Sequence, residues 1–235
     1  MSEIVAIVEG STEQTFVRDQ LAAHLGQSGI SIWAVLSGKN RRQGGVRKWA
    51  AARSDILRTL KEGRYCTTMF DFYAMPQDWP GRAEAAKLPW DQRGSYVEAA
   101  IMAHVAGRIG ESFDQRQFIP YVQVHEFEAL MFADVTKLAD VASALSGMSA
   151  AYLSSQFANV LELAGDPEAI NDHYETCPSR RITNLVQGYR KAANSPIVAQ
   201  RIGLVGLRTA CQHFAIWLGR LEALKPAGPA GHEPP

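Results

Sequence analysis

A continuous apolar run near the start of the 235-residue chain, Ile4-Val5-Ala6-Ile7-Val8, constrains the fold more than any other segment. Short runs rich in β-branched residues are typical of strands that are buried on both faces of a parallel sheet. Glu9-Gly10 follows at once, and Ser11 and Gln14 then have the spacing of a capping box at a helix start. The apolar residues of that helix recur at helical intervals: Phe16, Val17, Leu21 and Leu25. The sequence therefore predicts a central strand, a tight loop and a helix.

Strand and helix patterns continue to alternate over the first half of the chain. Further strands are indicated at residues 30–36, 66–70 and 118–124, and apolar stripes at helical spacing lie between them, for example at 96–109. Strands that alternate with helices in this way predict a doubly wound α/β fold with a mainly parallel sheet.

The later part of the chain has a different pattern, because it is helical almost throughout after Ala129. We expect an α/β core over residues 1–130 and a helical C-terminal region over 131–224 that packs on the core. The last residues, 225–235, are rich in Pro, Gly and Ala, and we expect them to form a disordered tail. The connection 72–94 contains three prolines and is long for a structureless loop, which favours a functional or mobile segment.

Charge and cysteine content exclude several classes of protein. Lys plus Arg and Asp plus Glu both total 24, so there is no global positive field and any surface for a polyanion must be local. The three cysteines have no paired spacing, which argues against a disulfide framework and against a thiolate zinc site. No apolar run approaches the roughly 20 residues that cross a bilayer, and the N-terminus lacks the features of a targeting leader. These features predict a cytoplasmic protein that does not associate with a membrane.

Acidic residues follow three of the predicted strands. Glu9 comes directly after the first, Asp71 after the third, and Glu126 and Glu128 just beyond the fourth. Because the carboxyl ends of parallel strands meet at one edge of a sheet, we expect these acids to converge there. Carboxylate oxygens are the usual ligands of Mg²⁺ and Mn²⁺, and a cation would relieve their mutual repulsion. The alternative is that each acid is a separate, solvated surface residue.

Whether Glu126 and Glu128, beyond the fourth strand, can both face one metal depends on the local backbone structure. On an extended segment Glu126 and Glu128 share one face, whereas a helix that begins there would let only one face the metal. His125, just before them, is either a ligand or proton shuttle or a structural residue that orients the neighbouring acids, and we favour the orienting role. His213 is expected to be a core histidine.

Glu13 lies about one helical turn beyond Glu9. It is a candidate catalytic residue if it faces the same site as Glu9 and Asp71. Equally, its charge can favour the N-terminus of the helix without any catalytic role.

Two local groups of basic residues are candidates for contacts to phosphate. The first lies in a glycine-rich stretch and contains Lys39, Arg41 and Arg42. The second is Arg180-Arg181, preceded by Ser179, which has the position of a cap for the next helix. Taken alone, each group is an ordinary solvated surface. The chain has neither a Walker phosphate loop nor a Gly-x-Ser-x-Gly elbow, which argues against nucleotide hydrolysis by either route.

The opening segment Val8-Glu9-Gly10-Ser11-Thr12-Glu13 resembles the glutamate motif of the TOPRIM domain, in the form found in overcoming-lysogenization-defect (OLD) nucleases. Other blocks resemble those of a TOPRIM-like bacterial family that is often encoded beside ATPases in anti-phage loci. These blocks are Met69-Phe70-Asp71-Phe72-Tyr73, Trp79-Pro80-Gly81, His125-Glu126-Phe127-Glu128-Ala129-Leu130, Pro178-Ser179-Arg180-Arg181-Ile182 and Cys211-Gln212-His213-Phe214. Together they cover most of the chain, and each is moderately specific.

The resemblance implies a TOPRIM-like fold in which Glu9 is a metal ligand or general acid/base and Asp71 binds metal. The chain departs from the family pattern at Asp71-Phe72-Tyr73, where a second aspartate is missing, and Glu126 or Glu128 is a candidate replacement. The implied activity is that of a metal-dependent nuclease that acts on nucleic acid. The implied setting is an ATPase-associated anti-phage system, with an ATPase as partner and oligomerisation left open.

Two other functions remain compatible with the sequence. The first is a non-catalytic TOPRIM scaffold that binds a partner, in which the missing aspartate reflects lost catalysis. A weaker alternative is a metal-dependent enzyme that acts on a small nucleotide, reached through the segment around Trp79.

Overall fold

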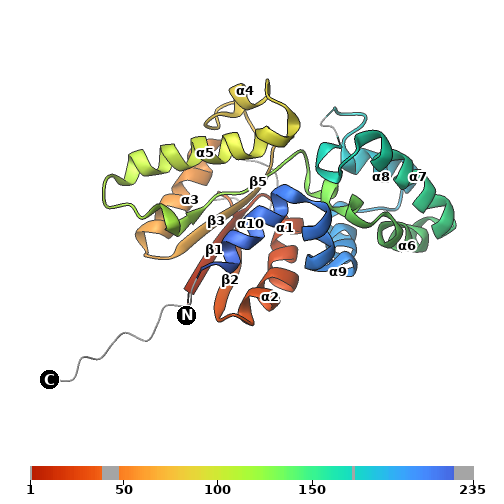
Figure 1. Ribbon diagram of the computed structural model, residues 1–235, viewed down its shortest axis with the longest axis horizontal. Helices are drawn as coiled ribbons and strands as arrows, with labels where there is room; N and C mark the ends of the chain where they lie inside the picture. The colour runs from red at the N-terminus through yellow and green to blue at the C-terminus, as the bar shows by residue number, and fades with distance from the viewer. Residues whose placement is uncertain (1, 39–47, 171–172, 225–235) are drawn as a thin grey trace.

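The computed structural model describes residues 2–38, 48–170 and 173–224 (Figure 1). Three of the predicted phosphate contacts, Lys39, Arg41 and Arg42, lie outside these ranges. The predicted tail at 225–235 also lies outside them.

The centre of the fold is a sheet in which every strand pairing is parallel. Within the described residues it is five-stranded, with the order β2-β1-β3-β4 and with β5 pairing farther along β3. The strands are β1 (Ser2–Val8), β2 (Ile30–Leu36), β3 (Tyr65–Asp71), β4 (Phe118–Ile119) and β5 (Val122–Gln123). The apolar run that opens the sequence is therefore an interior strand, as predicted.

The predicted strand at 118–124 is interrupted, because Pro120 has no N–H to donate to a ladder. The hydroxyl of Thr68 on β3 fills the gap: it donates to the carbonyl of Tyr121 at 2.9 Å and accepts from the amide of Tyr121 at 2.8 Å. β4 and β5 are consequently two short strands, and the Thr68 hydroxyl ties the segment between them to β3.

Helices cover both faces of the sheet, which explains the uninterrupted apolar pattern of β1. Ile4, Ala6 and Val8 pack with the helical segment at 11–26 and with α10 (Gln212–Glu222), whereas Val5 and Ile7 pack with α3 (Trp49–Lys61) and α5 (Trp90–Ile109). Figure 1 shows α3 and α5 on one side of the strands and α1, α2 and α10 on the other. The helices in this part are α1 (Ser11–Phe16), which continues through the π-helical turn η1 (Val17–Leu21) into α2 (Ala22–Gly26), α3 (Trp49–Lys61), α4 (Arg82–Ala85) and α5 (Trp90–Ile109), followed by the short 3₁₀ turn η2 (Gln115–Gln117).

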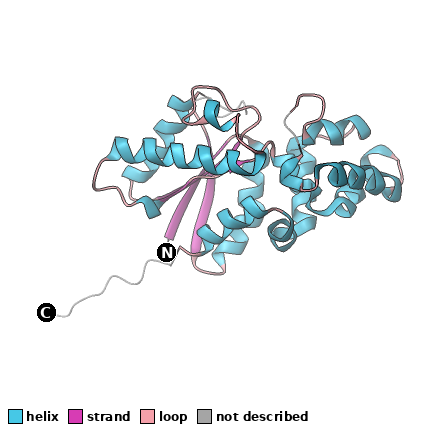
Figure 2. Cartoon of the chain, turned by 45° about the horizontal axis from the view of Figure 1, so that its top comes forward, coloured by secondary structure: helices cyan, strands magenta, loops and turns pink. Residues whose placement is uncertain are grey.

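After β5 the described chain is helical almost throughout, as predicted, and Figure 2 shows the strands confined to one half of the molecule. The helices after β5 are the 3₁₀ helix η3 (Phe127–Asp134), α6 (Val135–Ser146), α7 (Ala150–Ala164), η4 (Pro167–Ala169), α8 (Pro178–Leu185), α9 (Lys191–Ala210) and α10 (Gln212–Glu222). Trp217 on α10 donates its indole N–H to the Thr67 hydroxyl at 2.8 Å, so this last helix returns to the sheet. One apolar core links the two halves, and the proposed division at residue 130 stays a prediction.

The connection at 72–94 is not a structureless loop. It contains α4, and Phe72, Met75 and Trp79 are buried. The Trp79 ring lies 4.8 Å from Phe70 and 5.1 Å from Trp49, centroid to centroid. These aromatic side chains fill the core beside α3 and α5, which orders the segment and gives Trp79 a packing role.

All three cysteines are buried free thiols, in agreement with the absence of a disulfide framework. Within the described ranges, no helix has both the length and the apolar character that a membrane crossing requires.

Candidate functional site

The ends of β1 and β3 bring Glu9 and Asp71 together. These strands are neighbours in the sheet, with Val8 opposite Met69. The amide of Glu9 donates to the Met69 carbonyl at 3.2 Å, and a carboxylate oxygen of Glu9 accepts from the amide of Asp71 at 3.1 Å. The two acids therefore meet at the carboxyl edge of the sheet because a parallel ladder delivers both strand ends to one place.

Asp71 is buried with an unmet capacity for ligation. Its residue is 8% exposed, and among the described residues its Oδ1 atom has no hydrogen-bond partner. Burial raises the pKa of Asp71 well above its ordinary value, and the charges of Glu9, Glu13 and Glu128 raise it further against the opposing effect of Lys191. Because buried polar atoms in native proteins are nearly always satisfied, this oxygen is a candidate to contact a water, another donor or a cation.

Glu13 lies inside the same acidic cluster. Its Oε2 atom accepts from the Gly10 amide at 2.9 Å, so the helix cap is formed by Gly10 and Glu13 and not by the predicted pair Ser11 and Gln14. A glutamate at the third helical position reaches back to the amide before the helix, which explains the shift by one residue. Burial, and then the charge of Glu9, raise the pKa of Glu13 to about 8. Glu13 therefore caps the helix and lies beside Glu9, while a catalytic role for Glu13 stays a prediction.

Glu126 and Glu128 converge on a lysine. The Nζ atom of Lys191, the first residue of α9, lies 3.1 Å from Glu126 Oε1 and 2.8 Å from Glu128 Oε2. Ser179 donates its amide and its hydroxyl to Glu126, at 2.9 and 3.1 Å, and Ser195 donates its hydroxyl to Glu128 at 2.9 Å. Although a 3₁₀ helix begins at Phe127, both carboxylates face one cation.

The charges of this cluster are unequally compensated. Burial would raise the pKa of Glu126, but Lys191 and the Ser179 hydrogen bonds outweigh it and lower the pKa. Burial also raises the pKa of Glu128, and there Lys191 only partly offsets it. For Lys191, burial opposes the charged form, but Glu128, Glu126 and Asp71 raise its pKa. The lysine is therefore a cation that acts on three acids of the site, Glu126, Glu128 and Asp71.

His125 turns the chain from β5 into η3. Its φ is +68°, and it is the one non-glycine residue of the described chain with a positive φ. Its carbonyl accepts from the Tyr73 amide at 3.0 Å, which ties the turn to the segment that follows Asp71. The backbone of His125 thus sets where the next two acids lie, while an orienting role of its side chain stays a prediction.

The predicted basic pair lies in the first turn of α8, and both side chains contact the segment that precedes this helix. The Arg180 guanidinium lies 4.5 Å from the centre of the Tyr174 ring, and Arg181 Nε donates to the Thr176 carbonyl at 3.1 Å. Ser179 does not cap α8. The N-cap position belongs to Cys177, with Pro178 as the first helical residue, so Ser179 lies inside the helix. Its amide donates to the carboxylate of Glu126.

The donor chemistry of the site fits a hard cation. No set of three or more His, Cys, Asp or Glu side chains in the described ranges is already arranged around one point. Magnesium, however, keeps several waters and takes one or two carboxylates together with substrate oxygens. Glu9 and the buried Oδ1 of Asp71 supply such a pair, whereas Glu126 and Glu128 are engaged by Lys191.

Lys191, Ser179 and Ser195 were not predicted as site residues. Each meets its acid across 53 to 67 residues of sequence, so no local spacing signals the contact. The block that contains Ser179 was singled out by resemblance, but Lys191 had no such signal.

Comparisons with other proteins give a family and two structural relatives. The C-terminal region of the Burkholderia pseudomallei OLD protein is 15% identical, with a TM-score of 0.46, over 93% of this chain and 99% of that chain. The C-terminal region of the Xanthomonas campestris pv. campestris OLD protein is also 15% identical, with a TM-score of 0.39, over 93% of this chain and 97% of that chain. No curated protein matches the chain. The family model described as Domain of unknown function (DUF4276) matches residues 8–222, and the chain belongs to that family.

Proposed function

We propose that this protein is a metal-dependent nuclease of TOPRIM type that hydrolyses phosphodiester bonds, with Glu9 and Asp71 as its metal-binding carboxylates. One observation carries the proposal. The Glu9 carboxylate is held on the Asp71 amide at 3.1 Å, beside a buried Asp71 oxygen that has no hydrogen-bond partner in the described chain. A buried carboxylate oxygen without a partner costs folding free energy, and a bound cation would remove that cost and use the oxygen as a ligand.

Electrostatics support a cation at this place. Glu9, Glu13 and Glu128 each act on Asp71 in the direction that disfavours its charge. Like charges that are brought together in a buried site either retain protons or require neutralisation. Lys191 contacts Glu126 and Glu128 on one side of the cluster, and a divalent ion at Glu9 and Asp71 would neutralise the other side.

The residues of the chain have distinct roles in this proposal. A bound Mg²⁺ or Mn²⁺ would supply Lewis-acid stabilisation of phosphate oxygens and a more acidic water. Glu9 and Asp71 bind the ion, and Glu13, with a pKa of about 8, can take up or release a proton near neutral pH. The Lys191 side chain is 44% exposed, so its ammonium can meet a phosphate oxygen while it remains beside the glutamates.

The proposed substrate and the proposed biological context are those that the sequence resemblance implies. Nucleic acid is the proposed substrate, recognised by local positive charge because the whole chain is neutral. Arg180 and Arg181 directly follow Ser179, which contacts Glu126, and they are candidates for such recognition, as are Lys39, Arg41 and Arg42. We extend the proposal to a cytoplasmic anti-phage system in which an ATPase partner controls the nuclease.

Calorimetric titration with Mn²⁺ tests the site directly. The Glu9→Gln/Asp71→Asn variant removes both charges and largely preserves shape, and it should bind Mn²⁺ at least ~10-fold more weakly than wild type. Asp140→Asn, a matched change on the exposed surface of α6, should bind like wild type. Undiminished affinity in the double variant rules out the assignment.

The cleavage assay uses the chain together with the neighbouring ATPase, since release by a partner is part of the proposal. DNA and RNA are each incubated with Mg²⁺, Mn²⁺ or chelator. Cleavage should require metal, Glu9 and Asp71.

A non-catalytic, partner-binding scaffold is the second candidate, and two observations favour it. Lys191 already compensates Glu126 and Glu128, and Tyr73 stands where a second aspartate is expected. Cellular protection that persists with Glu9→Gln and Asp71→Asn would select this scaffold function.

A further inference from the structure

The outer side of β5 has no neighbouring strand in the described chain, yet its amide is satisfied. β5 pairs with β3 on its inner side, where Val122 lies opposite Phe70 and Gln123 opposite Asp71. The outward amide of Val122 donates to Glu98 Oε1 at 2.8 Å. A carboxylate from α5 therefore takes the place of the missing strand and avoids the cost of an unpaired buried N–H.

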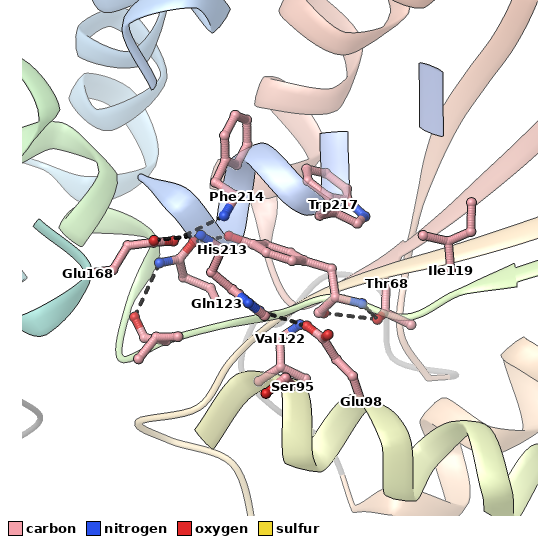
Figure 3. Close-up of polar contacts among 12 residues, drawn as sticks. Thr68, Ser95, Glu98, Ile119, Val122, Gln123, Glu168, His213, Phe214 and Trp217 are labelled. Carbon is pink, nitrogen blue, oxygen red and sulfur yellow. Dashed lines mark hydrogen bonds and ion pairs between the residues drawn. The ribbon is translucent and has the colours of Figure 1, made fainter. Parts of the chain in front are cut away.

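The same Glu98 oxygen also meets a histidine from the far end of the chain. His213 Nε2 on α10 lies 2.8 Å from Glu98 Oε1, and the two side chains are 14% and 12% exposed. Figure 3 shows Glu98 reaching from α5 toward Val122 and His213. One buried carboxylate thus joins α5, β5 and α10.

The surroundings hold His213 in one orientation. Glu168 accepts from the amides of His213 and Phe214, at 2.8 and 3.1 Å, and so caps the start of α10 (Figure 3). The Tyr121 ring stacks on the imidazole with centroids 5.3 Å apart. The absence of a side chain at Gly94 makes room for the contact. A Cβ at Gly94 would lie 2.7 Å from His213 Nε2 and 2.9 Å from the Val122 carbonyl.

The strand that this arrangement holds leads directly into the acidic site. Gln123 is the ladder partner of Asp71, and its carbonyl accepts from the Phe72 amide at 3.0 Å. Two residues later His125 turns the chain, and Glu126 and Glu128 follow. A displacement of β5 therefore moves these glutamates relative to Asp71.

We infer that Glu98 and His213 form an ion-pair clamp that fixes β5, positions the acids at residues 126–128 against Asp71, and loosens when His213 loses its proton. The function of those acids rests on the proposed function above, whereas the clamp itself does not. Both members are positioning residues, since neither touches the proposed metal pair.

The titratable groups around His213 favour its charged form. Those that face it are Glu98 and Asp91 from α5, Asp166 and Glu168 from η4, and Tyr121 before β5. Burial would lower the pKa of His213, but the hydrogen bond and charge of Glu98, assisted by Glu168, raise it. A cavity of about 200 Å³ beside His213, lined by Trp90, Asp91 and Ile216 among others, gives the imidazole a route for proton exchange.

Two measurements test the clamp without any need for catalysis. By NMR, the imidazole of His213 should titrate above the ordinary value of about 6.5 in wild type and at a lower pH in Glu98→Gln. By hydrogen exchange, protection over residues 121–130 should fall about tenfold in His213→Gln at pH 6.5. In wild type this protection, corrected for intrinsic exchange, should decline as pH rises through the His213 titration, and in Glu98→Gln it should not depend on pH.

His24→Gln is the matched control, because His24 pairs with Glu222 at 2.6 Å at a partly exposed position. It should leave protection over 121–130 unchanged. An ordinary His213 titration that Glu98→Gln does not alter, or unchanged protection in both clamp variants, overturns the clamp.

Mn²⁺ titration then separates the clamp from the proposed site. Weaker Mn²⁺ binding in Glu98→Gln at an unchanged unfolding midpoint supports positioning of the acids, and equal binding overturns that part. Wild type that binds no Mn²⁺ refutes the proposed function, while the exchange data still decide the clamp.

Discussion

The carboxylate of Glu9 accepts a hydrogen bond from the backbone amide of Asp71 at 3.1 Å, so the acid of one strand end is held by the backbone of the next. The contact uses only the backbone of Asp71. The Asp71 side chain is buried, and its Oδ1 atom lacks a hydrogen-bond partner in the described chain. Burying such an oxygen costs stability, which predicts a conflict between folding and function at this position.

Asp71→Asn should make the metal-free protein more stable. The substitution removes a carboxyl group that the fold must either bury as a charge or protonate, because burial and three neighbouring acids raise its pKa, and it keeps the side-chain shape. We expect a gain of about 1 kcal/mol in the free energy of unfolding at pH 7, measured by urea denaturation without metal. The same variant should lose the stabilisation that Mn²⁺ gives to wild type. A metal-free variant that is clearly less stable would contradict this account.

Stability of the metal-free protein should fall as pH rises from about 4.5 to 8. Over this range the unfolded chain loses the proton of Glu13 at its ordinary value of 4.5, while the folded chain keeps it until about pH 8. The unfolded state then binds fewer protons, so the free energy of unfolding decreases with pH, by up to about 5 kcal/mol. Glu13→Gln should flatten this slope in denaturation curves measured at each pH. Equal slopes in the variant and wild type would show that Glu13 is not the responsible group.

Gly94→Ala should destabilise the fold, although alanine normally favours a helix. The added Cβ would lie 2.7 Å from His213 Nε2 and 2.9 Å from the backbone oxygen of Val122, which has little freedom to move. We expect a cost of about 1–3 kcal/mol in thermal or urea unfolding. Gly107→Ala on the same helix is the control, because its Cβ would meet nothing within 4 Å in the described structure, and it should be neutral or stabilising by up to ~1 kcal/mol. Equal effects at the two positions would contradict the close packing at Gly94.

Lys191→Met should destabilise the protein because it leaves Glu126 and Glu128 without their shared cation. The expected cost is about 1–2 kcal/mol, less than for a fully buried pair, since the Lys191 side chain is 44% exposed. Adding Glu128→Gln to the variant should restore part of the loss, as measured in a double-mutant cycle. Purely additive effects would mean that the two side chains do not interact energetically.

Local hydrophobic patterns in the sequence were enough to predict most of the strands of the sheet. The apolar run before Glu9 and the strand before Asp71 were predicted from residues that are adjacent in sequence, and both form interior parallel strands. The doubly covered sheet and the helical second half follow from the same periodicities, because burial on two faces leaves a signal in the sequence itself. Even the break at Pro120 has a local cause, namely the missing N–H.

Tertiary packing alone decided which side chains complete the candidate site. Lys191 meets Glu126 across 65 residues, and His213 meets Glu98 across 115. Such contacts depend on the angles at which α9 and α10 return to the sheet, and these angles result from core packing summed over many apolar residues, not from the spacing of any polar motif. The sequence by itself could therefore predict which acids follow the strand ends. Only the folded chain shows that Lys191 contacts Glu126 and Glu128, and that His213 meets Glu98, which binds the strand leading to these glutamates.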